Sequence, residues 1–469
     1  MCDICFDNLL LLTDSYKFTH FKQYPPKTTK VYSYFESRGG KFENVVFFGL
    51  QYIIKRLLLG KVVTKEKIDE AKAFSKAHFG RSDAFNEAGW QYILDVHDGK
   101  LPIKIKAVPE GTVLPQKNVL FTVENTDPNC FWLTNYLETL FVQVWYPITV
   151  ASNSRAQKEV IAQFLHETAD DMKGLPFKLH DFGFRGATSI EAAGIGGMSH
   201  LVNFLGTDTL AGILTARKYY GCSMAGFSIP AAEHSTITTW QKSGEKDAFE
   251  NMCRQFPTGT IACVSDSYDI WNACENLWGK QLKNLLKCRD GTLVVRPDSG
   301  DPPEVVSKVL HLLGEAFGTI INKKGYKTLP PFVRIIQGDG IDLEMIKRIL
   351  NKLKSERWSS DNLAFGSGGA LLQKLNRDTL KCAYKCSMVT VDSKEINVFK
   401  QPIDDPGKKS KKGLLTLEYS SRDGYKTVEE GRGNATKDLL IPVFENGKLL
   451  KEYTFDEIRS RCEIPLLKK

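Results

Sequence analysis

Short apolar runs recur along the central part of the chain, and each is followed by a stretch with the spacing of an amphipathic helix. The runs end in glycines or charged residues, and roughly 20 to 40 residues separate one from the next, as in βα units. They span residues 178–181, 201–204, 226–230, 261–264, 292–295, 332–336 and 362–365. Consecutive units of this kind predict a parallel sheet, and this many in a row favour an irregular α/β barrel over an open sheet.

The two flanks of the chain have a different pattern. Residues 1–148 mix helical stretches, at 65–77 and 132–144, with β-like stretches at 104–108 and 119–123. After residue 382 the chain carries strand and turn signals, at 396–399, 414–418 and 447–448. We therefore predict an α/β barrel-like catalytic domain over 149–381. We also predict a mainly β second domain, assembled from residues 1–148 and 382–469.

Composition fits a globular protein with two domains. The chain has 469 residues, 42% hydrophobic and 25% charged, which is long for one core. The apolar stretch 6–13 has acidic Asp3 and Asp7 where a signal peptide would be basic. We expect no membrane segment and a cytoplasmic location, with nuclear or unconventional extracellular pools as alternatives. Eleven scattered cysteines suit free thiols, and the pair Cys2 and Cys5 lacks the second pair of a zinc site, so no metal site is predicted.

The net charge of +8 includes one dense group of cations. It consists of Lys408, Lys409, Lys411 and Lys412. These lysines form either a solvated loop or a flap that meets polyphosphate. Because no aromatic residues are interleaved with them, we do not expect nucleic acid as a partner.

Three strand-end loops indicate a sugar-phosphate site, because ligands of parallel α/β folds gather at the carboxyl ends of strands. The glycine-rich segment 365–369 precedes a helix start, where backbone N–H groups bind anions, and Arg377 is a candidate phosphate clamp. Residues 294–301 and 337–342 place carboxylates where vicinal ribose hydroxyls would bind. Each loop alone has a simpler reading, as an ordinary turn or, for Asp298, Ser299 and Asp342, as a helix cap.

Two further strand ends carry candidate chemistry. Phe182 and Phe184 flank Arg185 and offer faces for a flat heterocycle, unless they form a buried ring pair. Asp208 either binds substrate or caps the next helix. His234 follows a strand beside Glu233, and Asp266 and Asp269 at the next strand end are placed to orient its ring, although a structural histidine is equally compatible.

Long motifs in this order resemble one known family over nearly the whole chain. They lie at residues 14–20, 24–26, 121–127, 180–186, 231–237, 264–270, 296–300, 337–340 and 365–373. The chain is similar to the eukaryotic nicotinamide phosphoribosyltransferases, which are type II phosphoribosyltransferases. The family joins nicotinamide to phosphoribosyl pyrophosphate and releases nicotinamide mononucleotide and pyrophosphate, a reaction of NAD salvage.

The resemblance implies roles for individual residues. Phe182 would stack on the pyridine ring, with Tyr16 of a second subunit on its other face. Asp208 would accept a hydrogen bond from the carboxamide. Arg296 would contact the amide carbonyl and pyrophosphate. The remaining positions implied are Asp298, Gly338 and Asp339 for the ribose; Arg185, Gly369 and Arg377 for phosphate; Asp14, Ser228, Ser265 and Gly368 for substrate; Glu233 and Asp269 for catalysis; and Arg38, Lys385, Lys400 and Lys408 from the second subunit for pyrophosphate.

The same resemblance implies a homodimer with shared active sites, substrate-bound Mg2+ and ATP as a coupled co-substrate that phosphorylates His234. The chain departs from the family pattern at two places. The segment after Arg38, at 39–44, is short, and the amino-acid sequence of residues 188–191 differs slightly. The alternatives are a nicotinate phosphoribosyltransferase, and a non-enzymatic signalling or binding protein that retains the fold. The carboxylate of Asp208 favours an amide over nicotinate, which is itself an anion.

Overall fold

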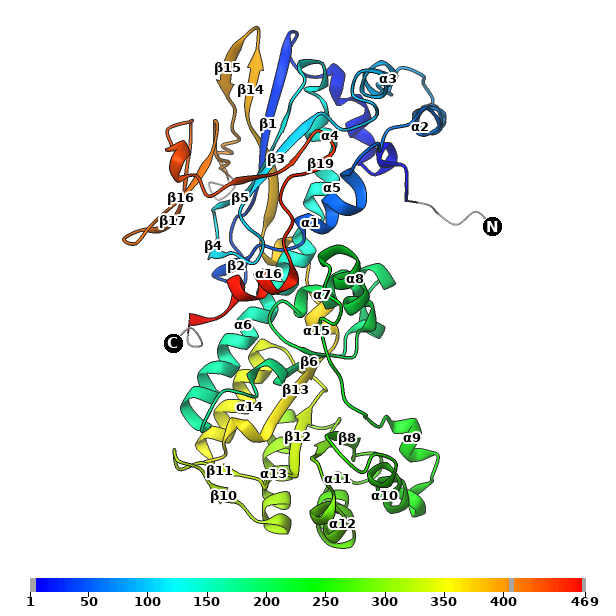
Figure 1. Cartoon of the computed structure of the whole chain (residues 1–469), viewed down its shortest axis with the longest axis vertical. Coiled ribbons are helices and arrows are strands. Elements are labelled where there is room, and N and C mark those ends of the chain that lie inside the picture. Colours follow the sequence, from blue (N-terminus) through cyan, green and yellow to red (C-terminus); the bar gives the residue numbers. More distant parts are fainter. Residues whose placement is uncertain (1–5, 405–408, 466–469) are drawn as a thin grey trace. The chain divides into compact units, whose positions relative to one another are not determined.

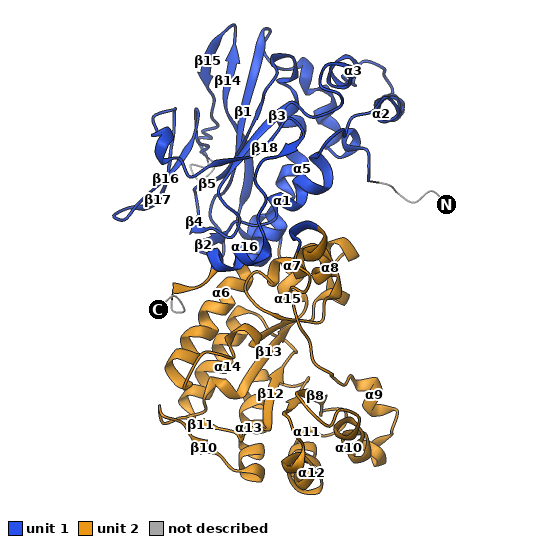
Figure 2. Ribbon diagram, viewed as in Figure 1, with its two compact units in different colours: residues 1–152, 219–221, 376–462 blue, residues 153–218, 222–375, 463–469 orange. Residues whose placement is uncertain are grey.

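The computed structural model describes residues 6–404 and 409–465, and its contacts divide the chain into two compact units (Figure 2). Unit 1 comprises residues 1–152, 219–221 and 376–462, and unit 2 comprises 153–218, 222–375 and 463–469. Unit 1 therefore combines the amino-terminal part of the chain with residues 376–462 from its carboxyl-terminal part. Lys408, Cys2 and Cys5 lie outside the described residues.

Unit 1 is built on a seven-stranded antiparallel sheet in the order β15-β14-β1-β5-β3-β18-β19. The strands are β1 Thr28–Ser37, β3 Ile103–Ala107, β5 Val119–Asn125, β14 Cys382–Val391, β15 Lys394–Asn397, β18 Ile441–Glu445 and β19 Lys448–Leu449. The strands from the amino-terminal part occupy the middle, and those from the carboxyl-terminal part complete both sides (Figure 1). The expected β-rich domain from both flanks is thus present as one sheet.

Smaller elements complete unit 1. They are β2 Asn44–Val46 paired with β4 Val113–Pro115, β16 Thr416–Ser420 paired with β17 Gly424–Val428, and the helices α1 Leu50–Ile53, α2 Lys65–Phe79, α3 Glu87–Val96, α4 Leu133–Tyr136, α5 Glu138–Val142 and α16 Phe455–Cys462. The longest of these helices, α2, begins where the Thr64 hydroxyl accepts from the Lys67 N–H and ends at Gly80, whose φ is +66°.

Unit 2 contains a six-stranded parallel sheet in the order β7-β6-β13-β12-β9-β8. The strands are β6 Leu179–Asp181, β7 Gly206–Thr207, β8 Ile261–Val264, β9 Leu293–Arg296, β12 Val333–Gln337 and β13 Leu363–Ser367. Five of the predicted apolar runs coincide with β6, β8, β9, β12 and β13. The prediction of a strand at 201–204 was wrong. These residues form the turn after α7, and the strand β7 begins at Gly206.

The segment 227–231 joins the two edges of this sheet and makes it an irregular barrel. Phe227 forms a parallel bridge to Gly206 of β7, and Ala231 forms one to Ala262 of β8. The Thr207 N–H donates to the Phe227 carbonyl at 3.0 Å, and the Ala262 N–H donates to the Pro230 carbonyl at 3.0 Å. The run at 226–230 therefore has barrel-strand contacts, although only isolated bridges form along it.

Helices cover the outside of the parallel sheet (Figure 1). They are α6 Trp145–Thr168, which begins in unit 1, α7 Ile190–His200, α8 Leu210–Tyr220, α9 His234–Thr238, α10 Glu245–Gln255, α11 Ile270–Asn272, α12 Lys283–Cys288, α13 Pro302–Phe317, α14 Leu343–Ser355 and α15 Gly369–Leu372; the hairpin β10 Ile320–Ile321 and β11 Lys327–Thr328 lies between α13 and β12. Helix α14 buries Leu343, Ile346, Leu350 and Leu353, one face at helical spacing. Its amino terminus is capped by Asp342, which accepts from the Met345 N–H at 2.9 Å.

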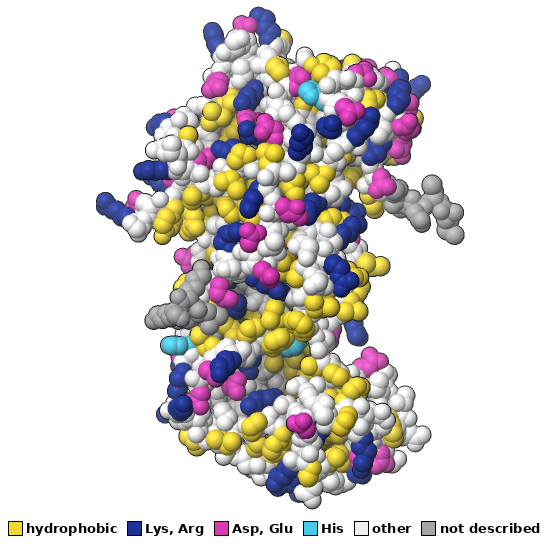
Figure 3. All heavy atoms as spheres, viewed as in Figure 1, with side chains coloured by type: hydrophobic (Ala, Val, Ile, Leu, Met, Phe, Trp, Pro, Cys, Tyr) yellow, Lys and Arg dark blue, Asp and Glu magenta, His cyan; other side chains and the backbone are white. Residues whose placement is uncertain are grey.

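Helix apolarity and surface charge are two further features of the described residues. Within residues 6–404 and 409–465, no helix is both long and apolar enough to cross a bilayer. On the face drawn in Figure 3, basic and acidic side chains are interspersed.

Candidate active site

A cavity of about 1070 Å³ lies at the carboxyl ends of the barrel strands, entirely within unit 2. Its lining comes from loops that follow five strands and from the segment after the bridging residues 227–231. The lining residues that the sequence singled out are Phe182, Arg185, Asp208, Glu233, His234, Arg296, Asp298, Gly338, Asp339, Gly368 and Gly369. Parallel strands bring these separate loops to one rim, as expected for ligand sites of this architecture.

Phe182 lines the cavity, and its ring occupies space that the absence of a side chain at Gly366 leaves open. A Cβ on Gly366 would lie 2.0 Å from the Phe182 Cε2 atom, and one on Gly338 would lie 3.6 Å from the same atom. The Phe182 N–H donates to the Ser367 carbonyl at 2.9 Å, which extends the pairing of β6 with β13. Phe182 and Phe184 both line the cavity, and Phe184 is 38% exposed.

Asp208 follows β7, and its carboxylate accepts a hydrogen bond from the Ser228 hydroxyl. Its backbone N–H donates to the Asp181 carbonyl at 2.9 Å, which fixes the loop against the end of β6. The buried Asp181 carboxylate accepts from the Gly183 N–H at 2.7 Å. Burial, with the nearby charge of Asp208, raises the pKa of Asp181 to about 6. Asp181 thus supports the loop that carries Phe182.

Arg296 is the last residue of β9, Asp298 follows two residues later, and both line the cavity. The α13 cap is Asp301, so neither Asp298 nor Ser299 has the capping role that the sequence left open. Burial raises the pKa of Asp298; the charges of Asp266 and Asp339 add to this effect, while Arg296 and His234 oppose it. Asp298 is therefore a half-buried carboxylate at which a cation or a hydroxyl donor would be stabilised.

His234 begins α9, and its Nε2 lies 3.0 Å from Oδ1 of Asp266. The other oxygen of Asp266 accepts from the Asp298 N–H at 3.1 Å and from the Ser299 hydroxyl at 2.6 Å. Asp266 therefore orients the His234 ring and ties it to the loop that carries Asp298. The imidazole remains accessible, with 47% of its side chain exposed. Glu233 caps α9 and accepts from the Ser235 hydroxyl.

The glycine-rich loop and the loop after β6 pack closely at the cavity rim. A Cβ on Gly183 would lie 3.0 Å from the Gly368 carbonyl oxygen, whereas one on Gly369 would meet no atom within 4 Å. Gly369 starts α15, so its neighbourhood combines free space with backbone N–H groups at a helix start. Arg185, on the facing loop, adds a positive charge to the same rim.

Three predicted site residues of unit 2 do not line this cavity; Ser228 lines a second cavity, and the other two are Ser265 and Asp269. Ser265 is fully buried; its hydroxyl donates to the Cys263 carbonyl at 3.0 Å and accepts from Trp278 Nε1 at 3.1 Å. Asp269 caps α11 by accepting from the backbone N–H groups of residues 271 and 272. Both have structural roles here, because the turn after β8 points their side chains at their own backbone.

The remaining predicted residues belong to unit 1. They are Asp14, Tyr16, Arg38, Arg377, Lys385 and Lys400. Tyr16 is 58% exposed, and Asp14 accepts from the Thr139 hydroxyl at 2.7 Å. Arg377, expected beside Gly369, lies in the unit that does not carry that glycine, 3.7 Å from Asp378.

A second cavity of about 550 Å³ lies along the interior of the barrel and shares Phe182, Asp208 and Arg296 with the first. Ser228 lines it, together with strand residues such as Val294 and Ile336.

The residues to which sequence reasoning gave no role are two that support the site, namely Asp181 and Gly366. Their only signal was position, next to Phe182 and within the glycine-rich loop.

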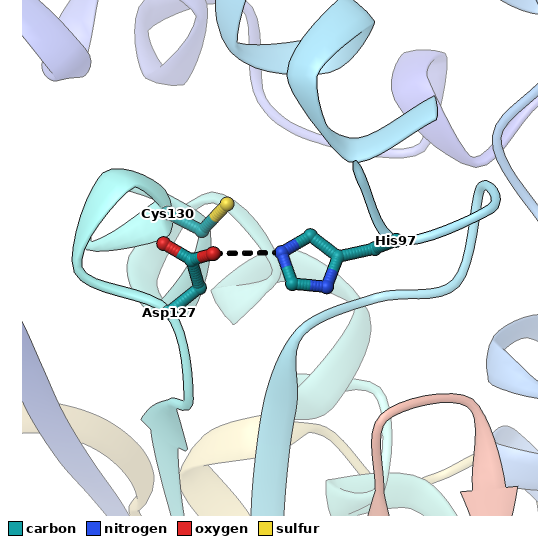
Figure 4. A group of neighbouring side chains, drawn as sticks. All are labelled: His97, Asp127 and Cys130. Carbon is teal, nitrogen blue, oxygen red and sulfur yellow. Dashed lines mark hydrogen bonds and ion pairs between the residues drawn. The ribbon is translucent and has the colours of Figure 1, made fainter. Parts of the chain in front are cut away.

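Figure 4 shows a separate cluster in unit 1, formed by His97, Asp127 and Cys130. One oxygen of Asp127 accepts from the Asn129 N–H at 2.8 Å, and the other lies 2.8 Å from His97 Nε2 and accepts from Tyr92. Burial, reinforced by Asp127, raises the pKa of the Cys130 thiol to about 12, so it stays protonated. Asp127 has partners for both oxygens, and we assign this cluster a structural role.

An aromatic ring, carboxylates, arginines and a glycine-rich loop thus line one cavity of an α/β barrel, the combination that the sequence associated with a sugar-phosphate site. Comparisons agree with this class. The model of the nicotinate phosphoribosyltransferase family matches residues 177–448, and that of the nicotinamide phosphoribosyltransferase N-terminal domain matches residues 8–105.

Curated relatives give the family more closely. A nicotinamide phosphoribosyltransferase of Xanthomonas campestris is 51% identical over 97% of this chain and 98% of its own. One of Acinetobacter baylyi is 34% identical over 97% of each. The chain belongs to the nicotinamide phosphoribosyltransferase family and is an enzyme of the pentosyltransferase class.

Solved structures agree in fold. Nicotinate-nucleotide pyrophosphorylase of Pyrococcus furiosus superposes with a TM-score of 0.60 at 16% identity, covering 98% of this chain and 96% of that one. Human nicotinic acid phosphoribosyltransferase gives 0.56 at 16% identity, covering 96% and 93%. The predicted barrel with a β-rich second domain is confirmed as an architecture of this kind.

Proposed function

We propose that this enzyme transfers the 5-phosphoribosyl group of phosphoribosyl pyrophosphate to nicotinamide, producing nicotinamide mononucleotide and pyrophosphate for NAD salvage. The observation that carries the proposal is the position of Phe182 and Asp208 at a cavity that also holds Asp298 and Asp339. An aromatic face beside a carboxylate suits a neutral pyridine carboxamide. Carboxylates a few residues away suit a ribose.

In this proposal each side chain has one task. Phe182 stacks on the pyridine ring, and Asp208 accepts from the carboxamide NH2. Arg296 contacts the amide carbonyl and the pyrophosphate. Ribose hydroxyls donate to Asp298 and Asp339. The 5-phosphate lies on the backbone of Gly368 and Gly369, with Arg185 nearby and Arg377 as a further phosphate contact; Gly338, Ser228 and Glu233 complete the lining.

The reaction is a displacement at the anomeric carbon, and it needs no general base because the pyridine nitrogen carries no proton. Catalysis then rests on positioning the two substrates and on stabilising charge on the departing pyrophosphate. Mg2+ supplies charge neutralisation on substrate oxygens when it is bound. The carboxylate oxygens of Asp298 and Asp339 would suit such a cation, because both line the cavity and burial, the main cause of the raised pKa of Asp298, makes a nearby positive charge favourable.

We propose that the active unit is a homodimer in which the partner's unit 1 completes each site. The support is that unit 1 carries an exposed Tyr16 and the cations Arg38, Lys385 and Lys400, none of which lines the cavity of unit 2. Tyr16 would cover the second face of the pyridine, and the cations would surround the pyrophosphate. Lys408, which lies outside the described residues, is assigned to the same group because the family resemblance implies it.

We further propose that ATP phosphorylates His234 and that hydrolysis of the phosphohistidine drives synthesis forward. The accessible imidazole beside the cavity and its contact with Asp266 support this step. Asp266 holds Nε2, which leaves Nδ1 as the ring nitrogen free to accept the phosphoryl group. A phosphoryl group there would add negative charge beside the pyrophosphate pocket and change substrate affinity.

One assay tests the phosphoribosyl transfer and the coupling to ATP. Purified protein, nicotinamide, phosphoribosyl pyrophosphate and Mg2+ should yield the mononucleotide, and nicotinate should be a much poorer acceptor. ATP should increase turnover of the wild-type enzyme but not of His234→Ala, which should keep its ATP-independent rate. Equal ATP stimulation in the variant would refute the coupling, and a preference for nicotinate would favour the related nicotinate phosphoribosyltransferase activity instead.

A further inference from the structure

A buried carboxylate lies among the cations of unit 1. Glu36 is the second-last residue of β1 and is 2% exposed. It pairs with Ala383 of β14, while Tyr34, two residues earlier, pairs with Lys385. Because side chains alternate along strands and paired residues share a face, Tyr34, Glu36 and Lys385 lie on one face of the sheet.

Both oxygens of Glu36 hold cations, and these come from different parts of the chain. Oε1 accepts from Arg38 Nε at 3.1 Å and from the Tyr34 hydroxyl at 3.3 Å. Oε2 accepts from Lys411 Nζ. The side chains of Arg38 and Lys411 are only 13% and 14% exposed, so these pairs are shielded from water more than ordinary surface ion pairs.

Hydrogen bonds also connect Lys400 to Tyr34, through Ser410 and Lys411. The Lys411 N–H donates to the Tyr34 hydroxyl at 2.8 Å. One residue earlier, Ser410 donates its N–H to the Lys400 carbonyl at 2.9 Å and accepts from the Lys400 N–H at 2.8 Å. Lys400 is thereby tied, through Ser410 and Lys411, to Tyr34 and Glu36 on β1.

Positive charge around Glu36 exceeds what this carboxylate neutralises. Burial lowers the pKa of Lys385; the neighbouring charges of Arg38, Lys400 and Arg377 add to this, and Glu138 opposes it. Nη2 of Arg38 is buried and finds no hydrogen-bond partner among the residues that the structure describes. An anion with several oxygens would satisfy both the excess charge and this free guanidinium nitrogen.

We propose that Glu36 is a positioning residue that presets a pyrophosphate-binding arrangement of Arg38, Lys400 and Lys411. Its carboxylate accepts from Arg38 Nε, while Arg38 Nη2 has no hydrogen-bond partner among the described residues, and it also holds Lys411, to which the Lys400 backbone is connected through Ser410. Lys411 is thereby added to Arg38, Lys385 and Lys400, the cations of unit 1 that are proposed to meet pyrophosphate. The inference rests on the proposed function, in which these cations meet the pyrophosphate group, and it adds the residue that orders them before the ligand arrives.

The test measures binding of inorganic pyrophosphate with Mg2+ to the full-length protein by calorimetry. Glu36→Gln removes the charge, and Glu36→Asp keeps the charge but shortens its reach. Each should weaken pyrophosphate binding about 10- to 100-fold, as expected for losing charge-assisted hydrogen bonds. The KM for nicotinamide should change less than about twofold, whereas a general structural defect would alter both.

Matched controls make the result decisive. Glu124→Gln removes a carboxylate of the adjacent strand β5 that pairs with Lys30, and it should bind pyrophosphate like the wild type. If the Glu36 variants do not fold, Tyr34→Phe removes the hydroxyl that contacts both Glu36 and Lys411, and it should weaken binding in the same direction. Unchanged pyrophosphate affinity in a folded Glu36 variant, or in Tyr34→Phe, overturns the inference. A wild-type protein that does not bind pyrophosphate overturns the proposed role of Arg38, Lys385 and Lys400 in the transfer reaction.

Discussion

Aspartates at the candidate active site differ in what their oxygens contact, and this decides what each can do. Asp266 uses both oxygens on His234 and the 298–299 loop, so it positions other groups. Asp181 is buried and supports the loop that carries Phe182. Asp208 and Asp298 face the cavity and keep acceptor capacity for a ligand. One residue type therefore serves two functions, and the local backbone selects between them.

Asp208→Asn should lower the preference for nicotinamide over nicotinate. The carboxylate repels the anionic nicotinate and accepts from an amide, whereas the asparagine amide is neutral and can donate. We expect the ratio of the two kcat/KM values to fall on the order of 10- to 100-fold. Steady-state kinetics with both acceptors measure it. Asp247→Asn, on the exposed surface of α10, is the control; an unchanged ratio in Asp208→Asn would remove the proposed role.

At the scale of elements, the site depends on how closely two strand-end loops approach. Strands β6 and β13 are neighbours in parallel register, with Asp181 opposite Ser367. The loops that follow them meet where Gly183 faces Gly368 and Phe182 faces Gly366. Glycine is required at Gly366 because of contact and not because of its backbone angles, since its φ is not in the left-handed region.

Gly366→Ala should specifically impair nicotinamide binding. The new methyl group would lie 2.0 Å from Phe182 Cε2, so the ring must leave its position. We expect the KM for nicotinamide to rise at least about 10-fold, consistent with a misplaced anchor. Gly369→Ala provides the contrast, because its methyl group meets no atom within 4 Å. Any effect of that change should fall on the phosphoribosyl substrate, and equal nicotinamide KM values for the two variants would contradict this account.

At the scale of the whole molecule, unit 1 is held together by contacts between distant parts of the chain. Glu110 is one centre of these contacts and is 2% exposed. It accepts from the Gln51 N–H at 2.7 Å and from the Tyr220 hydroxyl at 2.8 Å, and Arg461 donates to its carbonyl. The segment 219–221 belongs to unit 1 partly through this contact.

Stability of unit 1 should fall as pH rises from about 4.5 to about 7. Burial raises the pKa of Glu110 from 4.5 to about 7. Between these values the folded state keeps a proton that the unfolded state releases, so the free energy of unfolding decreases with pH, by on the order of 3 kcal/mol. Urea unfolding at pH 5 and pH 8 measures this loss. Glu110→Gln should reduce it, whereas the exposed Glu87→Gln should not; an identical loss in Glu110→Gln would refute the assignment.

The sequence by itself determined the parallel central sheet, the β-rich domain from both flanks, and most of the cavity lining. These follow from local periodicity and from the rule that parallel strands end at a common edge. The run at 201–204 shows where local pattern is insufficient. An apolar run can form the turn that ends a helix as well as a strand, because both bury apolar side chains.

Only the tertiary structure decided the contacts between residues far apart in the chain. The bridges of Phe227 and Ala231 that close the barrel, and the pairing of Glu36 with Lys411, depend on strand register and on packing. Gly366 acquires its function from the ring of Phe182, which is remote in sequence. Periodicity fixes which face a side chain occupies, but the neighbour that it meets there depends on the whole fold.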